Sequence, residues 1–153
     1  MKKIIFLIFI LILGLFQATL LNYFRVFLVK PDCLLIGMVI ASLFFHPFLA
    51  IGFSVFSGIY KDILGFNYFG INTLLFALWS IFIIRLSKKI SIDNNPTRAV
   101  LIFMVVALNG IGVRIISGAS VSTGIFLKVI ILESLYTALV TPLIFKFMQP
   151  VLE

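Results

Sequence analysis

Charged residues are scarce in this chain: they make up 11% of its 153 residues, whereas hydrophobic residues make up 63%. Soluble domains carry about 25% charged residues, so we do not expect a water-soluble fold. The chain has one cysteine, Cys33, and one histidine, His46. These numbers exclude an internal disulfide, a cysteine-rich metal site and a metal site built from several histidines.

Motifs for nucleotide binding and catalysis are also missing. The sequence has no phosphate-binding glycine loop, no zinc-binding helix motif and no nucleophile elbow. A pair of acids is the one common catalytic arrangement that remains, and nothing in the sequence indicates that Asp32, Asp62 and Glu133 converge. We therefore expect no enzymatic activity and no cofactor.

Long apolar runs fill the chain instead. The run IIFLIFILILGLF is apolar on every face, whereas a strand of a transmembrane barrel would alternate apolar and polar residues. Lipid offers no partner for an unpaired backbone group, so such runs cross the membrane as helices. The sequence predicts an all-α integral membrane protein, whose first span is expected to be retained because no cleavage-like site follows it.

The apolar run at residues 33–60 is too long for one straight span. Its 28 residues would extend roughly 42 Å at about 1.5 Å per residue, against a hydrocarbon core of about 30 Å. Pro47 lacks an amide proton and disfavours helix at His46 before it. A turn at this pair would divide the run into spans near residues 29–45 and 48–64.

The basic residues indicate the number of spans. The loop RLSKKISIDNNPTR is the densest basic segment, and it shares the cytoplasmic side with Lys2 and Lys3 only if an even number of spans lies between them. We predict one membrane domain over residues 1–153, a six-helix bundle with both termini in the cytoplasm. The spans are expected near residues 4–24, 29–45, 48–64, 67–84, 99–117 and 124–148. The basic residues expected inside are Lys2, Lys3, Arg85, Lys88, Lys89, Arg98 and Lys146, and those outside are Arg25, Lys30 and Lys61.

Two acids lie near the outer ends of predicted spans. Asp32 follows Pro31 at the start of the second span, where helix initiation or a contact with a partner accounts for it. Asp62 lies at the outer end of the third span, one turn after Gly58 on the same helical face. It marks the membrane boundary, or it takes part in helix packing or an ion pair.

Glu133 lies near the middle of the sixth predicted span. An acid there is costly and normally faces the bundle interior or a water-filled cavity. Arg114 of the fifth span is a better candidate partner than Lys128, and Asn109 would add hydrogen bonds and belong to the same polar cluster. Three interpretations stay open: a buried ion pair, a ligand or partner site, and a protonated acid.

The order of these features resembles the MreD family, the rod shape-determining membrane proteins of bacteria, over essentially the whole chain. The resemblance rests on the lysine-flanked first span, on Pro31-Asp32, on the turn ending in Pro47, on a glycine-spaced segment around Asp62, and on Pro142 in the last span. The glycines of that segment are Gly52, Gly58, Gly65 and Gly70. The chain departs from the family pattern at His46, where an arginine is more usual, and at Lys61, where an apolar residue is commoner and the lysine looks incidental.

The resemblance implies a non-enzymatic scaffold of the cell-elongation machinery, which builds the lateral peptidoglycan, in the bacterial inner membrane. Its partner would be an MreC-like single-span protein, which connects it to MreB-like filaments and to a peptidoglycan polymerase and transpeptidase. The bundle would be similar to the substrate-capture subunits of energy-coupling-factor transporters. The residues expected to bind the partner are Pro31, Asp32, Gly58, Asp62, Gly65 and Gly70.

The alternative function is a vitamin-type, small-molecule capture subunit of a membrane transporter. Asn109, Arg114 and Glu133 would then line a pocket between helices.

Overall fold

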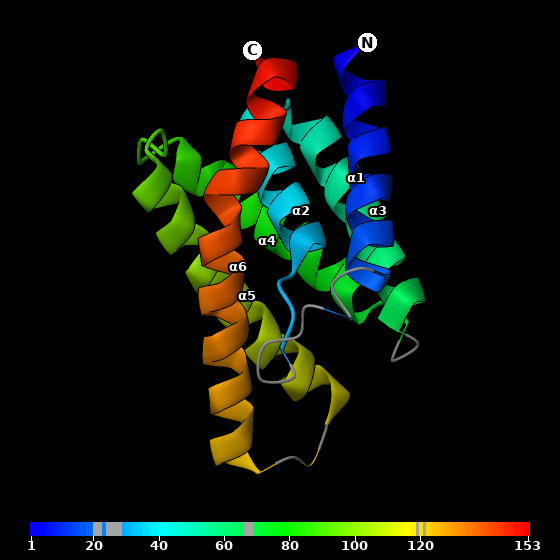
Figure 1. Ribbon diagram of the computed structural model, residues 1–153, viewed down its shortest axis with the longest axis vertical. Helices are drawn as coiled ribbons and strands as arrows, with labels where there is room; N and C mark the ends of the chain where they lie inside the picture. The colour runs from blue at the N-terminus through cyan, green and yellow to red at the C-terminus, as the bar shows by residue number, and fades with distance from the viewer. Residues whose placement is uncertain (20–22, 24–28, 66–68, 119, 121) are drawn as a thin grey trace.

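The structure of the protein is a computed structural model that describes residues 1–19, 23, 29–65, 69–118, 120 and 122–153. Its elements over these residues are six helices, which confirms the all-helical prediction (Figure 1). The helices are α1 (Lys2–Ala18), α2 (Cys33–Phe44), α3 (Pro47–Gly65), α4 (Ile71–Ser87), α5 (Asn95–Ser117) and α6 (Thr123–Leu152). Arg25, the end of the first predicted span and the start of the fourth lie outside the described residues.

Three of the described helices, α3, α5 and α6, are long and apolar enough to cross a membrane. The helices α2 and α4 are apolar but shorter, with 12 and 17 residues. At about 1.5 Å per residue, 17 residues extend roughly 26 Å, close to the thickness of a hydrocarbon core. Length and composition together identify a membrane protein.

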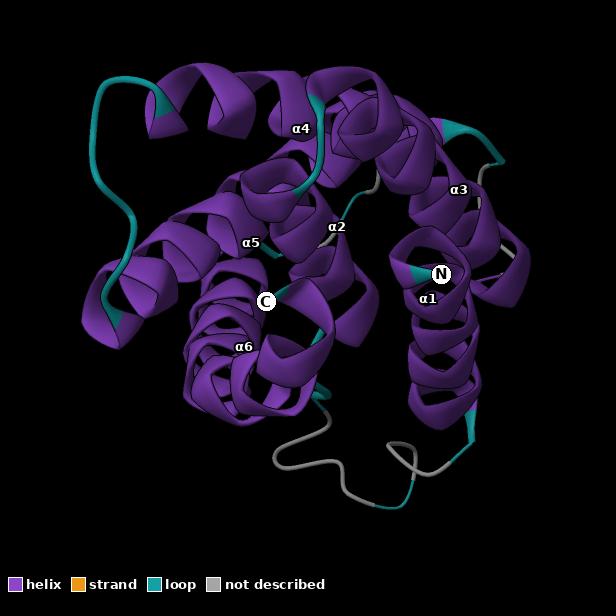
Figure 2. Cartoon of the chain, turned by 90° about the horizontal axis from the view of Figure 1, so that it is seen from above, coloured by secondary structure: helices purple, strands orange, loops and turns teal. Residues whose placement is uncertain are grey.

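The helix α2 is the centre of the bundle. Every residue from Cys33 to Ser42 is buried, and α2 contacts each of the other five described helices. Figure 2, which looks along the bundle, shows α2 between them. Its sequence CLLIGMVIAS has no polar face, as expected for a helix that packs on all sides.

The helical run is interrupted between α2 and α3, where the sequence predicts a turn. Phe44 is the last residue of α2 and Pro47 is the first of α3. The rings of Phe6, Phe45 and Phe53 pack together beside this turn, with centroids 4.8 to 5.2 Å apart. These aromatic contacts join α1 to both helices of the α2–α3 hairpin.

Both ends of the chain lie at the same end of the bundle (Figure 1). The Lys2 ammonium group donates hydrogen bonds to the backbone carbonyl oxygens of Leu152, at 3.4 Å, and Glu153, at 2.8 Å. The end of α5 and the start of α6 lie at the opposite end of the bundle.

Candidate functional site

The Asp62 carboxylate caps the N-terminus of the neighbouring helix, α4. Its Oδ2 atom accepts hydrogen bonds from the backbone N–H of Gly70 at 3.0 Å, and from the N–H and hydroxyl of Thr73 at 3.1 and 2.7 Å. Its Oδ1 atom accepts from the backbone N–H of Asn72 at 3.1 Å and from its side-chain amide at 2.9 Å. The first N–H groups of a helix have no partner within the helix, so Asp62 supplies acceptors that α4 itself lacks.

Gly58 allows α3 and α4 to approach closely one turn before this cap. A Cβ atom placed on Gly58 would lie 2.5 Å from the Thr73 Cα atom and 2.9 Å from the Asn72 carbonyl oxygen. Both neighbours are backbone atoms of α4, which cannot move without moving the helix. Gly58 and Asp62 therefore act together: the glycine brings α4 near enough for the carboxylate to reach its first turn.

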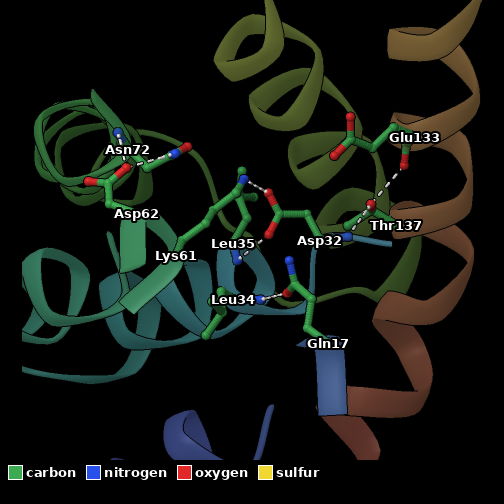
Figure 3. A network of polar contacts seen from close by, with 9 residues as sticks. All are labelled: Gln17, Asp32, Leu34, Leu35, Lys61, Asp62, Asn72, Glu133 and Thr137. Atoms are coloured by element: carbon green, nitrogen blue, oxygen red, sulfur yellow. Dashed lines mark hydrogen bonds and ion pairs between the residues drawn. The ribbon is translucent and has the colours of Figure 1, made fainter. Parts of the chain in front are cut away.

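Lys61 and Asp32 form an ion pair between α3 and the start of α2 (Figure 3). Asp32 is 1% exposed, and it also accepts a hydrogen bond from the backbone N–H of Leu35 at 3.2 Å, so it is the N-cap of α2. The Lys61 ammonium group lies 5.3 Å from the centre of the Phe76 ring on α4. The family resemblance suggested that Lys61 is incidental, whereas the structure gives it contacts with two other helices.

The start of α2 is also bound by α1 and α6. The Gln17 side-chain oxygen of α1 accepts from the backbone N–H of Leu34 at 3.1 Å. The Asp32 N–H donates to the Thr137 hydroxyl of α6 at 3.0 Å, and that hydroxyl donates to the Glu133 carbonyl at 2.7 Å. Figure 3 shows these contacts converging around Asp32. Sequence reasoning missed Gln17, although a lone glutamine in an apolar run is a signal that could have identified it.

A cavity of about 290 Å³ lies beside this network, between α3, α4, α5 and α6. Its polar and small lining residues are Asp32, Lys61, Asp62, Gly65, Asn72, Asn109, Gly110 and Glu133, and the rest of the lining is apolar. The Glu133 carboxylate points from α6 toward the side on which Asp32 and Lys61 lie (Figure 3). Asn109 and Glu133 of the predicted polar cluster thus line one cavity, together with the ion pair.

The remaining predicted residues have different surroundings. The Arg114 guanidinium lies 4.1 Å from the centre of the Phe126 ring, and Phe126 lines the cavity. Pro31 is buried next to Asp32. Gly65 is exposed, and a Cβ atom placed on it would meet no atom within 4 Å, whereas Gly70 precedes α4 with a positive φ of 97°. A left-handed backbone of this kind favours glycine.

The chemistry available at this site is ion pairing and hydrogen bonding. Among the described residues, no three His, Cys, Asp or Glu side chains are placed to hold a metal ion. Cys33 is buried in α2. Asp32 instead pairs with Lys61 and caps α2, Asp62 caps α4, and Glu133 lines the cavity.

Comparison with known proteins identifies the family of the chain. Neither the search of curated proteins nor the search of solved structures finds a similar protein. The model of the family described as "rod shape-determining protein MreD" matches residues 1–151, which is nearly the whole chain. The chain therefore belongs to the MreD family of rod shape-determining membrane proteins.

Proposed function

We propose that this MreD-family protein is a non-enzymatic scaffold of the cell-elongation machinery in the bacterial inner membrane. The observation that carries this proposal is the family match over residues 1–151. The fold supports it, because most described residues belong to apolar helices and few of the described residues lie outside them. Such a protein acts mainly by packing against other membrane helices.

The proposed topology is a single domain of six spans over residues 1–153, with both termini in the cytoplasm. Lys2 donates a hydrogen bond to the Glu153 carbonyl oxygen, so the two termini lie at the same end of the bundle. This supports an even number of crossings. The basic connection between α4 and α5, with Lys88 and Lys89, lies toward the same end of the bundle as the termini (Figure 1). Positive charge on that side favours the cytoplasm.

The proposed partner is an MreC-like single-span protein, through which the scaffold would reach MreB-like filaments and the peptidoglycan polymerase and transpeptidase. We propose that the partner docks at the outer ends of α2, α3 and α4. The predicted docking residues have two roles there. Pro31, Asp32, Gly58 and Asp62 are buried and would act by holding the three helix ends in place. Gly65 is exposed and would contact the partner directly, next to the turn at Gly70.

Co-purification of the tagged chain with the MreC-like protein tests this proposal. Gly65→Trp adds a bulky side chain in open space and should reduce partner recovery severalfold without changing thermal unfolding. Gly52→Trp is the matched control, because Gly52 is also exposed on α3 with open space around it and lies near the other end of the helix. Full partner recovery and normal rod shape with Gly65→Trp would refute docking at this surface.

The alternative, a vitamin-type capture subunit similar to those of energy-coupling-factor transporters, is favoured by the cavity beside Glu133. Its volume of about 290 Å³ is at the lower limit for small-molecule sites, which run from about 300 to 1,000 Å³. Binding of a vitamin-sized ligand to the purified protein would support this function. Rounded cells on depletion, without a nutrient requirement, would support the scaffold instead.

A further inference from the structure

The cavity between α3, α4, α5 and α6 has acceptor atoms that the protein leaves without donors. Among the described residues, the side-chain oxygens of Asn72 and Asn109 are buried and have no hydrogen-bond partner. Both residues line the cavity, as does the Glu133 carboxylate. The orientation of Asn72 is fixed, because its side-chain N–H₂ group donates to Asp62 at 2.9 Å. A buried acceptor without a donor is destabilising, so this cavity suits a ligand that donates hydrogen bonds.

The charges around the cavity favour a cationic ligand. The lining contains three acids, Asp32, Asp62 and Glu133, and one base, Lys61. Asp32 is paired with Lys61, and Asp62 accepts five hydrogen bonds, four from α4 and one from its N-cap Gly70. Lys61 also acts electrostatically on Glu133, and Lys30 does so more weakly. Counting both lysines against the three acids, the neighbourhood keeps one net negative charge.

We propose that this cavity binds one primary ammonium group, held by the Glu133 carboxylate and the side-chain oxygens of Asn72 and Asn109. An ammonium group carries three N–H donors and one positive charge, which matches three acceptors and one net negative charge. A compact divalent cation fits less well, because such ions need several oxygen ligands converging on one point. The described His, Cys, Asp and Glu side chains do not form a group of that kind.

The place of the cavity indicates where the ammonium group comes from. Gly65 ends α3, Asn72 lies in the first turn of α4, and Val113 lies in the last turns of α5. Glu133 lies ten residues after the start of α6, but it lines the same cavity as these helix-end residues. The cavity therefore lies at the ends of α3 and α4, the level at which lipid headgroups lie. A phosphatidylethanolamine headgroup and a free soluble amine offer the same ammonium chemistry. The proposed ammonium site does not depend on the scaffold function.

Native mass spectrometry of the purified full-length protein with defined lipids tests the site. Phosphatidylethanolamine should be retained in preference to phosphatidylcholine, whose quaternary ammonium has the same charge but no N–H donor, and to anionic phosphatidylglycerol. Ethanolamine added as a soluble competitor separates the two sources. Displacement of the lipid at millimolar ethanolamine would assign the site to soluble amines, whereas retention would assign it to the lipid. Equal retention of the three lipids, without binding of ethanolamine, would overturn the proposal.

Two variants assign the binding to these acceptors. Glu133→Gln and Asn109→Leu should each weaken retention of phosphatidylethanolamine about tenfold, because each removes a charged or buried hydrogen bond. Asp93→Asn is the matched control, since Asp93 is an exposed acid outside the cavity. Unchanged lipid preference in both cavity variants would overturn the proposal. If one variant fails to fold, the other variant and the comparison of lipids on the unmodified protein still decide the outcome.

Discussion

Asp62 of α3 accepts both hydrogen bonds that Thr73 of α4 can donate, from its backbone N–H at 3.1 Å and from its hydroxyl at 2.7 Å. A cap of this kind normally comes from the residue just before the helix. Here that residue is Gly70, which has no side chain to offer. The acid on α3 takes over the role of the N-cap, and α4 depends on α3 for the hydrogen bonds of its first turn.

Replacing Asp62 by Asn should therefore destabilise the protein. An amide keeps one acceptor oxygen but turns an N–H₂ group toward donors of α4, so at least one buried donor loses its partner. We expect the free energy of unfolding in detergent to fall by about 1–3 kcal/mol. Asp93→Asn, at an exposed position, should leave it unchanged. Equal stability of the two variants would show that the cap contributes nothing.

Gly58 and Gly52 give a second matched comparison within α3. Gly58→Ala would place a Cβ atom 2.5 Å from the Thr73 Cα atom, whereas Gly52→Ala meets no atom within 4 Å. Alanine favours a helix over glycine by about 1 kcal/mol. Thermal unfolding should thus shift downward for Gly58→Ala and stay the same or rise for Gly52→Ala. A rise for both variants would contradict the close approach of α3 and α4.

The Lys61–Asp32 pair should respond to a double-mutant cycle. Lys61→Met alone leaves the buried Asp32 carboxylate without its counter-ion, and we expect a loss of roughly 3–5 kcal/mol in unfolding free energy. Adding Asp32→Asn removes that charge and retains a side chain that caps α2. The double variant should therefore be more stable than Lys61→Met. Additive losses, measured by denaturant unfolding, would mean that the two residues do not interact.

Single cysteines in a Cys33→Ala background can report the topology. The test positions are Tyr23, His46, Ser91 and Ser122, all of them exposed. An impermeant thiol reagent should label cysteines at Tyr23 and Ser122 on intact cells, and those at His46 and Ser91 only after permeabilisation. Labelling of His46→Cys from outside would mean that α2, with 12 residues, does not cross the membrane. The span count would then have to be revised.

Hydropathy predicted where the helices lie but not where they begin. The second span was expected from residue 29, whereas α2 begins at Cys33, because Asp32 caps it. The fifth was expected from residue 99, whereas α5 begins at Asn95, with Asn94 as its N-cap and Pro96 in its first turn. The side-chain cap of Asp32 sets the start of α2, and proline in the first turn favours the start of α5, so neither start follows from the apolar run.

The contacts of the site were harder to predict. Asp62 and Lys61 are neighbours in the sequence, yet one binds α4 and the other binds Asp32, 29 residues away. Three of the five donors to Asp62 are backbone N–H groups. Every residue except proline has such a group, so the sequence does not indicate which ones bind Asp62. The side of the helix to which each charge points depends on the packing around α2. Local patterns could therefore identify the acids but not their partners.

The shared cap also bears on how the protein enters the membrane. A helix terminus that meets lipid without partners costs several kcal/mol for each unsatisfied group. Because Asp62 supplies the acceptors for the first turn of α4, that helix becomes compatible with lipid only alongside α3. The two helices should thus leave the insertion machinery as a paired hairpin. In a ribosome-stalled chain that ends within α4, α3 should therefore remain at the insertion machinery.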